Sequence, residues 1–267
     1  MIPLKLSLLY PTILVHGIGG DSSDLIDLKN GLESEGAEVY NMEIGNGKID
    51  SIIWNINKQC QVLGENINNL SLESDKINLI GVSQGGLLAR CYVEKYANSI
   101  KPVHSLITYG APHMGIYISW IDLSKLEYWK NPFKYQEYLD NNDFLAYINN
   151  DRKHTDMKLY RDNLVSLDNF LVIWTDLEKV VDPKESTRFE FYNISMAETS
   201  GDLEIVNFQE SEIYIEDIIG LRELDKNGKL KVKQYDCQHE EFKHSKCFLK
   251  NFTNQQYSLL DLTISLL

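Results

Sequence analysis

The chain has 267 residues, of which 43% are hydrophobic and 24% are charged, so it is long enough to bury one sizeable core. Its formal net charge of −13 repels phosphate backbones and anionic lipid, which argues against nucleic acid as a partner. Its apolar runs fall short of the ~20 residues that a membrane-spanning helix needs, so no integral membrane segment is expected.

The predicted elements alternate between strands and helices along the chain. Short apolar runs predict strands at 12–16, 38–44, 77–82, 105–109 and 170–175. Helices are expected at 24–34, at 49–70 and after residue 83. In the second of these, apolar residues recur every three or four positions and place Cys60 on the buried stripe. This alternation indicates an α/β protein with a mostly parallel central sheet and helices on both faces.

Three later segments depart from the alternation. Residues 117–165 are rich in Tyr, Trp, Asn and Asp without clear periodicity, and we expect an insertion over the C-terminal edge of the sheet. Asn227-Gly228, within 212–235, is a hairpin signal, and 247–267 is expected to close the chain as a helix. Because no repeat or linker interrupts the chain, residues 1–267 are interpreted as one domain.

The stretch Gly81-Val82-Ser83-Gln84-Gly85 joins a predicted strand directly to a predicted helix. This is the context of a nucleophile elbow, in which a serine is held on a sharp turn with its hydroxyl exposed above the sheet. Glycines are required because side chains at these positions would collide with the neighbouring strand and helix. The alternative is a structural glycine-rich turn that happens to contain a serine.

A serine nucleophile needs a histidine base and an acid that orients this base. In proteins with this elbow, the order along the chain is serine, acid, histidine. His104, His113 and His154 are better explained as structural or solvated residues. His239 lies between the last apparent strand and the last predicted helix, where the base is expected, and His244 falls in or near that helix. His239 is therefore the predicted base.

The loop that follows the strand at 170–175 supplies three candidates for the acid that orients the base: Asp176, Glu178 and Asp182. We favour Asp182, because it follows two valines and precedes a proline that stiffens the loop. The oxyanion requires backbone N–H donors. We expect these from Gln84, the residue after the nucleophile, and from Ile18 in the loop after the first strand.

Four possible zinc ligands stand close together as Cys237, His239, His244 and Cys247. A structural zinc ion there would occupy the predicted base and leave Ser83 without one. A disulfide between Cys237 and Cys247 is the second alternative, and we favour it over zinc. Neither a metal nor a cofactor is therefore expected in the site.

The chain resembles the lysosomal palmitoyl-protein thioesterases. The glycine loops at 16–19 and 81–86 are shared with many lipases, and further stretches that recur in order are more specific. These are Met42-Glu43-Ile44-Gly45, Glu127-Tyr128-Trp129 with Asn131-Pro132, Phe144-Leu145-Ala146 with Ile148-Asn149, Val181-Asp182-Pro183, Phe189 to Tyr192, and Gly220 to Asp225 with Gly228. The resemblance covers nearly the whole chain.

The resemblance implies an α/β-hydrolase fold, with Ser83 as nucleophile, Asp182 as acid, His239 as base, and Ile18 and Gln84 as oxyanion donors. It implies removal of long fatty acyl groups from cysteine in proteins, with S-acylated proteins or peptides and acyl thioesters as partners and without a cofactor. We expect the insertion at 117–165, with aromatic residues from Trp120 to Tyr147, to form part of the acyl-binding groove. A monomer and a lysosomal or secretory location are expected by analogy, although no secretory signal is visible. A carboxylic-ester lipase, esterase or acyltransferase with the same triad is the alternative, and a pairing of Cys60 with Cys91 stays open.

Overall fold

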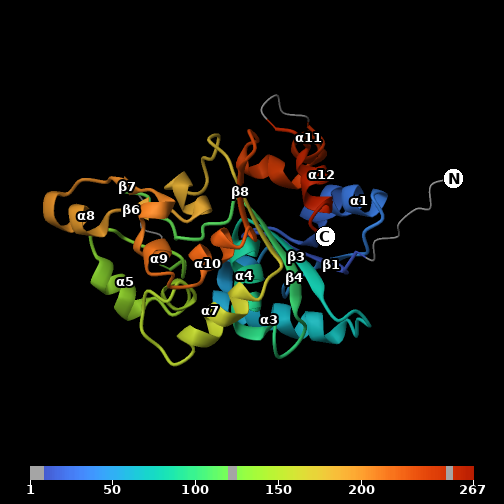
Figure 1. The fold of residues 1–267 in the computed structure, drawn as a ribbon, viewed down its shortest axis with the longest axis horizontal. Coiled ribbons are helices and arrows are strands. Elements are labelled where there is room, and N and C mark those ends of the chain that lie inside the picture. The colour runs from blue at the N-terminus through green and yellow to red at the C-terminus, as the bar shows by residue number, and fades with distance from the viewer. Residues whose placement is uncertain (1–8, 120–124, 251–254) are drawn as a thin grey trace.

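The centre of the computed structural model, which describes residues 9–119, 125–250 and 255–267, is a six-stranded parallel sheet (Figure 1). Its strand order is β2-β1-β3-β4-β5-β8. The strands are β1 (Thr12–Val15), β2 (Val39–Met42), β3 (Ile77–Val82), β4 (Val103–Tyr109), β5 (Asn169–Trp174) and β8 (Leu230–Gln234). The predicted parallel sheet is thus confirmed, and all of its pairs are parallel.

Helices cover both faces of this sheet, because each central strand is apolar on both sides. Ile13 of β1 packs toward α3 (Ile56–Asn69), α4 (Gln84–Tyr96), α7 (Met157–Val165) and α10 (Leu221–Lys226). Its neighbour Leu14 belongs to the opposite face, which α1 (Ile26–Ser34), α11 (Ser245–Phe248) and α12 (Leu259–Ile264) cover. Successive strand side chains therefore enter two separate hydrophobic clusters.

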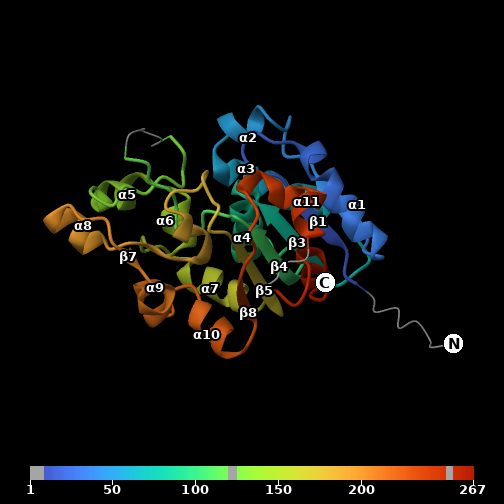
Figure 2. The ribbon, with the colours of Figure 1, turned by 90° about the horizontal axis from the view of Figure 1, so that it is seen from above.

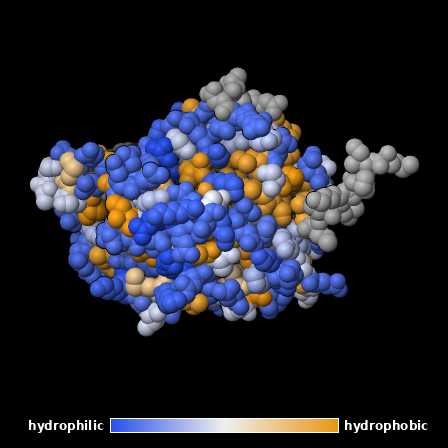
Figure 3. All heavy atoms as spheres, in the orientation of Figure 1, coloured by the Kyte–Doolittle hydropathy of each residue, from blue (hydrophilic) through white to orange (hydrophobic). Residues whose placement is uncertain are grey.

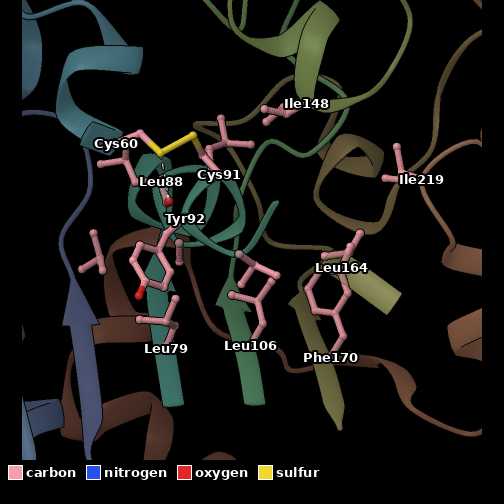
Figure 4. Close-up of a cluster of buried hydrophobic side chains, with 14 of the residues drawn as sticks. Cys60, Leu79, Leu88, Cys91, Tyr92, Leu106, Ile148, Leu164, Phe170 and Ile219 are labelled. Atoms are coloured by element: carbon pink, nitrogen blue, oxygen red, sulfur yellow. Dashed lines mark hydrogen bonds between the residues drawn. A yellow bond between two sulfur atoms is a disulfide. The ribbon is translucent and has the colours of Figure 1, made fainter. Parts of the chain in front are cut away.

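The core on the α4 side also holds a disulfide. Leu79, Leu106 and Phe170 rise from three neighbouring strands toward Leu88 and Tyr92 of α4 (Figure 4). Above them a disulfide joins Cys60 on α3 to Cys91 on α4. Cys60 is fully buried, as the helical periodicity predicts.

A lateral lobe extends from the sheet on the left of Figure 1, and the view from above shows the same arrangement (Figure 2). It combines α5 (Tyr135–Asn141) and α6 (Leu145–Ile148) with α8 (Ile194–Ser200), α9 (Glu212–Ile215) and the antiparallel pair β6 (Phe191–Tyr192) and β7 (Ile205–Val206). A hydrogen bond of 3.3 Å from the Tyr135 N–H to Glu198 Oε1 ties its two halves together. The predicted insertion therefore packs against a second segment that we did not anticipate from the sequence.

The 3₁₀ turns are Ser22–Leu25, Lys184–Arg188, Phe208–Glu210 and His239–Lys243.

The predicted helix 49–70 is wrong in its first third. It divides into α2 (Asp50–Ile53) and α3, because the side chain of Asn55 accepts hydrogen bonds from the N–H groups of Asn57 and Lys58 and caps a new helix. The residues before this cap leave the buried stripe, and Ile52 and Ile53 are exposed.

The hairpin predicted at Asn227-Gly228 is also wrong. Gly228 adopts a left-handed φ of +68° and ends α10, while the Lys229 N–H reaches back to the Leu224 carbonyl. Asn-Gly serves here as a helix stop before a parallel strand. The predicted terminal helix is replaced by α11 and α12, which are separate short helices.

The side chains of Arg90 and Glu94 are fully buried next to each other on α4, with 3.4 Å between Arg90 Nε and Glu94 Oε1. Burial raises the pKa of Glu94 from 4.5 to about 8 despite the nearby positive charges of Arg90 and Lys95. Below about pH 4.5 the carboxyl binds its proton in both the folded and the unfolded chain. Between pH 4.5 and 8 only the folded chain holds the proton, so a rise in pH favours unfolding.

We therefore expect the free energy of unfolding, measured with urea, to fall as the pH rises from 5 to 8. The loss is of the order of a few kcal/mol at most, since one pKa unit corresponds to about 1.4 kcal/mol. Glu94→Gln cannot titrate, and its stability should vary much less over the same range. An equal decline in this variant would exclude Glu94 as the cause.

Candidate active site

Ser83 stands at the junction of β3 and α4 with φ +56° and ψ −128°, a conformation that L-residues rarely adopt. Added side chains at both flanking glycines would collide with backbone. A Cβ on Gly81 would lie 2.3 Å from the Gly85 carbonyl oxygen, and one on Gly85 would lie 2.2 Å from that of Val15. The strained turn and the need for both glycines agree with the elbow that the sequence predicts.

His239 begins the 3₁₀ turn that follows β8 and forms a hydrogen bond with Glu178, with 2.7 Å between Nδ1 and Oε2. Glu178 lies in the loop after β5. Its other oxygen accepts hydrogen bonds from the N–H groups of Lys179, Val180 and Val181, so the loop wraps around the carboxylate. Burial opposes ionisation of Glu178, but His239 and these N–H groups outweigh it and lower the pKa of the carboxyl. Glu178 is thus held as an anion against the ring.

Asp182, the acid favoured from the sequence, does not lie at His239. Its side chain is exposed and forms a hydrogen bond with Tyr192, and its carbonyl accepts one of 2.7 Å from the Tyr117 N–H. Burial, together with the charge of Glu185, raises the pKa of its carboxyl. The proline after Asp182 constrains the backbone of the loop and does not direct this carboxylate to the base. The structure therefore brings Glu178, and not Asp182, to His239, and it places Asp176 against Lys184 and Gln234.

The four other histidines that were weighed as the base have partners away from Ser83. His104 contacts Asp168, His113 is buried against Thr108 and Phe189, and His154 contacts Tyr147 and Asn150. His244 is half exposed beside Asp27. Of the histidines considered as the base, His239 is the one that lines a cavity with Ser83; His16 also borders this cavity, but its Nε2 accepts a hydrogen bond from the Ile44 N–H.

The loop after β1 packs directly on the elbow. A Cβ added to Gly17 would lie 3.0 Å from the Ser83 Cβ, so only glycine permits this approach. Ile18 and Gly19 follow, and the Gly19 N–H donates a hydrogen bond of 3.0 Å to Ser51 Oγ. Ile18 and Gln84, the two predicted oxyanion donors, are therefore on segments that meet at Ser83.

Ser51 connects these two segments. It is buried on α2, and its carbonyl accepts hydrogen bonds from the side chains of Gln84 at 3.0 Å and Gln59 at 3.3 Å. The Gln84 amide also donates to Gln59 Oε1 at 3.0 Å. The Ser51 hydroxyl thus holds the loop after β1, and the Ser51 carbonyl holds the side chain of Gln84. No motif or periodicity around Ser51 indicates this role.

A cavity of about 190 Å³ opens at the elbow. It is lined by Ser83, His239, Ile18, Val180 and other residues of the same loops. Both the predicted nucleophile and the predicted base therefore face one space, where a reacting carbonyl can reach them.

Cys237 and Cys247 are joined by a disulfide, which encloses His239 in a short loop. Both thiols are consumed by this bond and cannot act as thiolate ligands. Among the described residues no group of three or more metal-ligating side chains occurs. The arrangement agrees with the disulfide alternative and not with the zinc alternative.

A larger cavity of about 580 Å³ lies in the lateral lobe. On the left of Figure 3, the surface of this lobe shows apolar residues between hydrophilic ones. Residues 117–165 contribute Lys130, Tyr135 and Asp151 to its walls. Of the aromatic residues expected to form an acyl groove, Tyr128, Tyr138 and Phe144 are buried in the core, whereas Tyr135 lines this cavity. Trp120 lies outside the described residues.

The sheet order, the strained serine elbow and the hydrogen-bonded histidine and glutamate define an α/β-hydrolase. Solved structures with this fold align over most of the chain. An extracellular α/β-hydrolase from a Paenibacillus species has a TM-score of 0.53 at 11% identity and covers 96% of this chain and 98% of its own. A monoacylglycerol lipase from Paleococcus ferrophilus has a TM-score of 0.52 at 14% identity, and the alignment covers 96% of this chain and 95% of the lipase.

The sequence comparisons identify the family. A model of the palmitoyl protein thioesterases matches residues 11–122 and 117–239. The chain is 32% identical to palmitoyl-protein thioesterase 3 of Dictyostelium discoideum over 91% of its length and 90% of that protein. It is 25% identical to the human lysosomal thioesterase PPT2, over 82% and 78% respectively. The chain therefore belongs to the palmitoyl protein thioesterase family, and the predicted resemblance is confirmed.

Proposed function

We propose that this protein is a serine thioesterase that hydrolyses long-chain fatty acyl thioesters of cysteine, with Ser83 as nucleophile, His239 as base and Glu178 as orienting acid. The observation that carries the proposal is the hydrogen bond between His239 and Glu178 beside the strained Ser83. Relatives named as palmitoyl-protein thioesterases supply the substrate class.

In the first half-reaction Ser83 Oγ attacks the thioester carbonyl carbon while His239 accepts the hydroxyl proton. Glu178 holds the imidazole through Nδ1 and stabilises its positive charge when the second nitrogen takes up the proton. The oxyanion is stabilised by the N–H groups of Ile18 and Gln84. Collapse of the tetrahedral intermediate breaks the carbon–sulfur bond, and the leaving cysteine sulfur takes the proton from His239.

In the second half-reaction water attacks the acyl-serine. His239 removes a proton from the water, the same two N–H groups stabilise the oxyanion, and the ester bond to Ser83 breaks. The proton returns to Ser83 Oγ, and the fatty acid leaves. Every proton that is removed is thereby returned, so the cycle consumes only the thioester and water.

Hydrolysis rates of a matched pair of sixteen-carbon substrates, one a cysteine thioester and one a serine oxygen ester, test the reaction class. A thiolate with a pKa of about 8.5 leaves more readily than an alkoxide, so we expect faster turnover of the thioester. Ser83→Ala is the control for background hydrolysis. A preference for the oxygen ester would support the alternative lipase or esterase activity.

Ser51→Ala tests the proposed oxyanion site. Loss of the hydroxyl releases the Gly19 N–H and allows the Ile18 donor to move. We therefore expect kcat to fall about 10- to 100-fold. This loss is smaller than the ~10²–10³-fold loss that follows removal of an oxyanion donor itself. KM should change little, because the oxyanion exists only after attack.

A matched control for Ser51→Ala is Ser105→Ala. Ser105 is equally buried, but its hydroxyl donates to the Leu266 carbonyl at the other end of the strands. This variant should lose stability without a comparable loss of kcat, and Ser51→Thr should restore turnover. Equal effects of Ser51→Ala and Ser105→Ala on kcat would refute a positioning role.

A lysosomal or secretory location follows from relatives named lysosomal thioesterases. The two disulfides are compatible with such a location. The greater stability at acid pH that is expected from the raised pKa of Glu94 is compatible with it as well. Among the described residues, helices with the length and apolarity needed to cross a membrane are absent. S-acylated proteins or peptides are the proposed partners, and a monomer stays a prediction.

A further inference from the structure

Two turns that are far apart in the sequence meet at the cavity beside the predicted nucleophile. The 3₁₀ turn His239–Lys243, which we call the base turn, contributes its two ends and Glu240 to the cavity wall. Asp24 contributes from the 3₁₀ turn that precedes α1. Figure 1 and Figure 2 both show α11, the helix after the base turn, beside α1. The wall therefore combines charged residues of both turns.

Three of these charged side chains contact one another, and we call them the charged cluster. Lys243 Nζ lies 2.8 Å from Glu240 Oε2 and 3.9 Å from Asp24 Oδ2. The side chains of Lys243, Asp24 and Glu240 are 20%, 29% and 68% exposed, so all three reach solvent. The hydrogen bond to Lys243 lowers the pKa of the Glu240 carboxyl, which keeps this group mostly ionised at pH 5. An ammonium has three donors, so two carboxylates leave one donor of Lys243 for a further acceptor.

The proposed mechanism determines where the leaving group lies. His239 passes the proton of Ser83 to the cysteine sulfur, so this sulfur must be within hydrogen-bond reach of the imidazole when the carbon–sulfur bond breaks. The α-carbon of the cysteine is separated from the sulfur by one methylene, so its amino and carboxyl groups also lie near the base turn. Glu240 follows His239 directly in the chain, and Lys243 ends the same turn. The charged cluster thus borders the place of these two groups.

The two signs of charge in the cluster distinguish between forms of the substrate. A cysteine inside a polypeptide presents neutral amide groups on both sides, and covering charged side chains with them removes water without supplying an opposite charge. The single amino acid S-acyl-cysteine presents an ammonium and a carboxylate, which can form charge-assisted hydrogen bonds with the cluster. The cavity volume of about 190 Å³, below the ~300–1,000 Å³ of sites for drug-sized ligands, suits one residue better than a stretch of polypeptide.

We propose that the charged cluster recognises the α-ammonium and α-carboxylate of S-acyl-cysteine, so that the enzyme prefers this acylated amino acid to an acylated cysteine inside a polypeptide. Lys243 binds the carboxylate, and Asp24 and Glu240 bind the ammonium. This inference rests on the proposed thioesterase function and adds to it the chemical form of the leaving group. Hydrolysis of the peptide bonds of S-acylated proteins must then supply the substrate, because both charged groups appear only when the bonds on either side of the cysteine are broken.

The test compares four substrates with the same sixteen-carbon acyl group in one neutral detergent: S-palmitoyl-cysteine, its amide, its N-acetyl derivative and its N-acetyl amide. The amide lacks the carboxylate, the N-acetyl derivative lacks the ammonium, and the N-acetyl amide lacks both, like a cysteine inside a polypeptide. Rates are measured at pH 5, where the protonated amino group cannot attack its own thioester. We expect kcat/KM for S-palmitoyl-cysteine to exceed that for the N-acetyl amide about tenfold or more. Palmitoyl-coenzyme A, which carries no charge close to its sulfur, should resemble the N-acetyl amide.

Substitutions in the cluster test each half of the site. Lys243→Met should reduce the preference for a carboxylate over its amide to less than about twofold, while the preference for the ammonium over its acetylated form persists. The double variant Asp24→Asn, Glu240→Gln should show the reverse. Each preference is a ratio within one variant, so a general loss of activity or of folded protein does not alter it.

Lys246→Met and Asp27→Asn are the matched controls. Lys246 is exposed on α11, and Asp27 is half exposed on α1 beside His244. Both lie close in sequence to the cluster but outside the residues that line the cavity. Their substrate preferences should equal those of the wild type.

The outcomes separate the inference from the function on which it rests. If the wild type hydrolyses the four thioesters at similar rates, or prefers the N-acetyl amide or the coenzyme A thioester, the inference fails and the thioesterase function stands. If S-palmitoyl-cysteine is preferred but Lys243→Met keeps the full preference for the carboxylate, another group recognises it and the inference is overturned. If the wild type hydrolyses none of the thioesters, the proposed function fails and the inference with it.

Discussion

Replacement of Ser83 by alanine is expected to reduce kcat for a sixteen-carbon thioester by about 10⁶-fold, close to the background rate. The strained φ of +56° at this residue places its Oγ on the outside of a turn that both flanking glycines make possible. Alanine tolerates the backbone as well as serine does, so only the nucleophile is lost. The measurement is single-turnover release of the acyl group, together with labelling by a fluorophosphonate that reacts with activated serines.

Ser105→Ala again serves as the control, because it removes a buried hydroxyl far from the elbow. It should retain both turnover and one equivalent of label. The Ser83→Ala protein should keep the urea midpoint of the wild type and take up no label. Turnover at even a tenth of the wild-type rate would assign the nucleophile to another residue.

The fold was predictable from the sequence wherever side-chain periodicity reports burial. The strands with residues such as Ile13 and Leu79 are apolar on both sides because helices cover both faces of the sheet. The serine elbow was predictable for a different reason. At Gly81 and Gly85 the neighbouring backbone lies so close that no residue with a Cβ fits. In both cases the physical constraint is local and leaves its mark in the residues themselves.

The errors occur where a short polar contact overrides a pattern. Asn55 caps α3 and interrupts a periodicity that would otherwise continue from Ile49, while Gly228 ends a helix that was interpreted as the approach to a hairpin. The lateral lobe was underestimated for a related reason. Its second half, around Phe191 and Val206, packs against the insertion across a long separation in sequence that periodicity does not report.

The acid now proposed, Glu178, was missed because its position depends on how the loop after β5 folds. Glu178 gathers three consecutive N–H groups on one oxygen, which directs the other oxygen to His239. A signal existed, since Glu178 comes four residues after the end of β5 and its side chain is one methylene longer than that of aspartate. The proline after Asp182 was given more weight, although it constrains the backbone and not the direction of the carboxylate.

Glu178→Gln is expected to lower kcat by about 10³–10⁴-fold, whereas Asp182→Asn should change it less than about twofold. In the variant the amide oxygen can still accept the hydrogen bonds of Lys179, Val180 and Val181, so the loop should keep its shape. The amide NH₂ group then faces His239 Nδ1 and favours the tautomer whose proton is on Nε2, the nitrogen that must accept the proton of Ser83. The base is thereby blocked without being removed.

Asp182→Asn is the matched control, because Asp182 is another carboxylate of the same loop and is hydrogen-bonded to Tyr192. Steady-state rates at pH 5–8, with urea midpoints for each variant, make the comparison. Because the pKa of Glu178 is held below its usual range, its charge should persist across this interval, and the deficit of Glu178→Gln should be nearly independent of pH. A large loss in Asp182→Asn with near-normal turnover in Glu178→Gln would return the role of the acid to Asp182 and contradict the hydrogen bond on which the proposed mechanism depends.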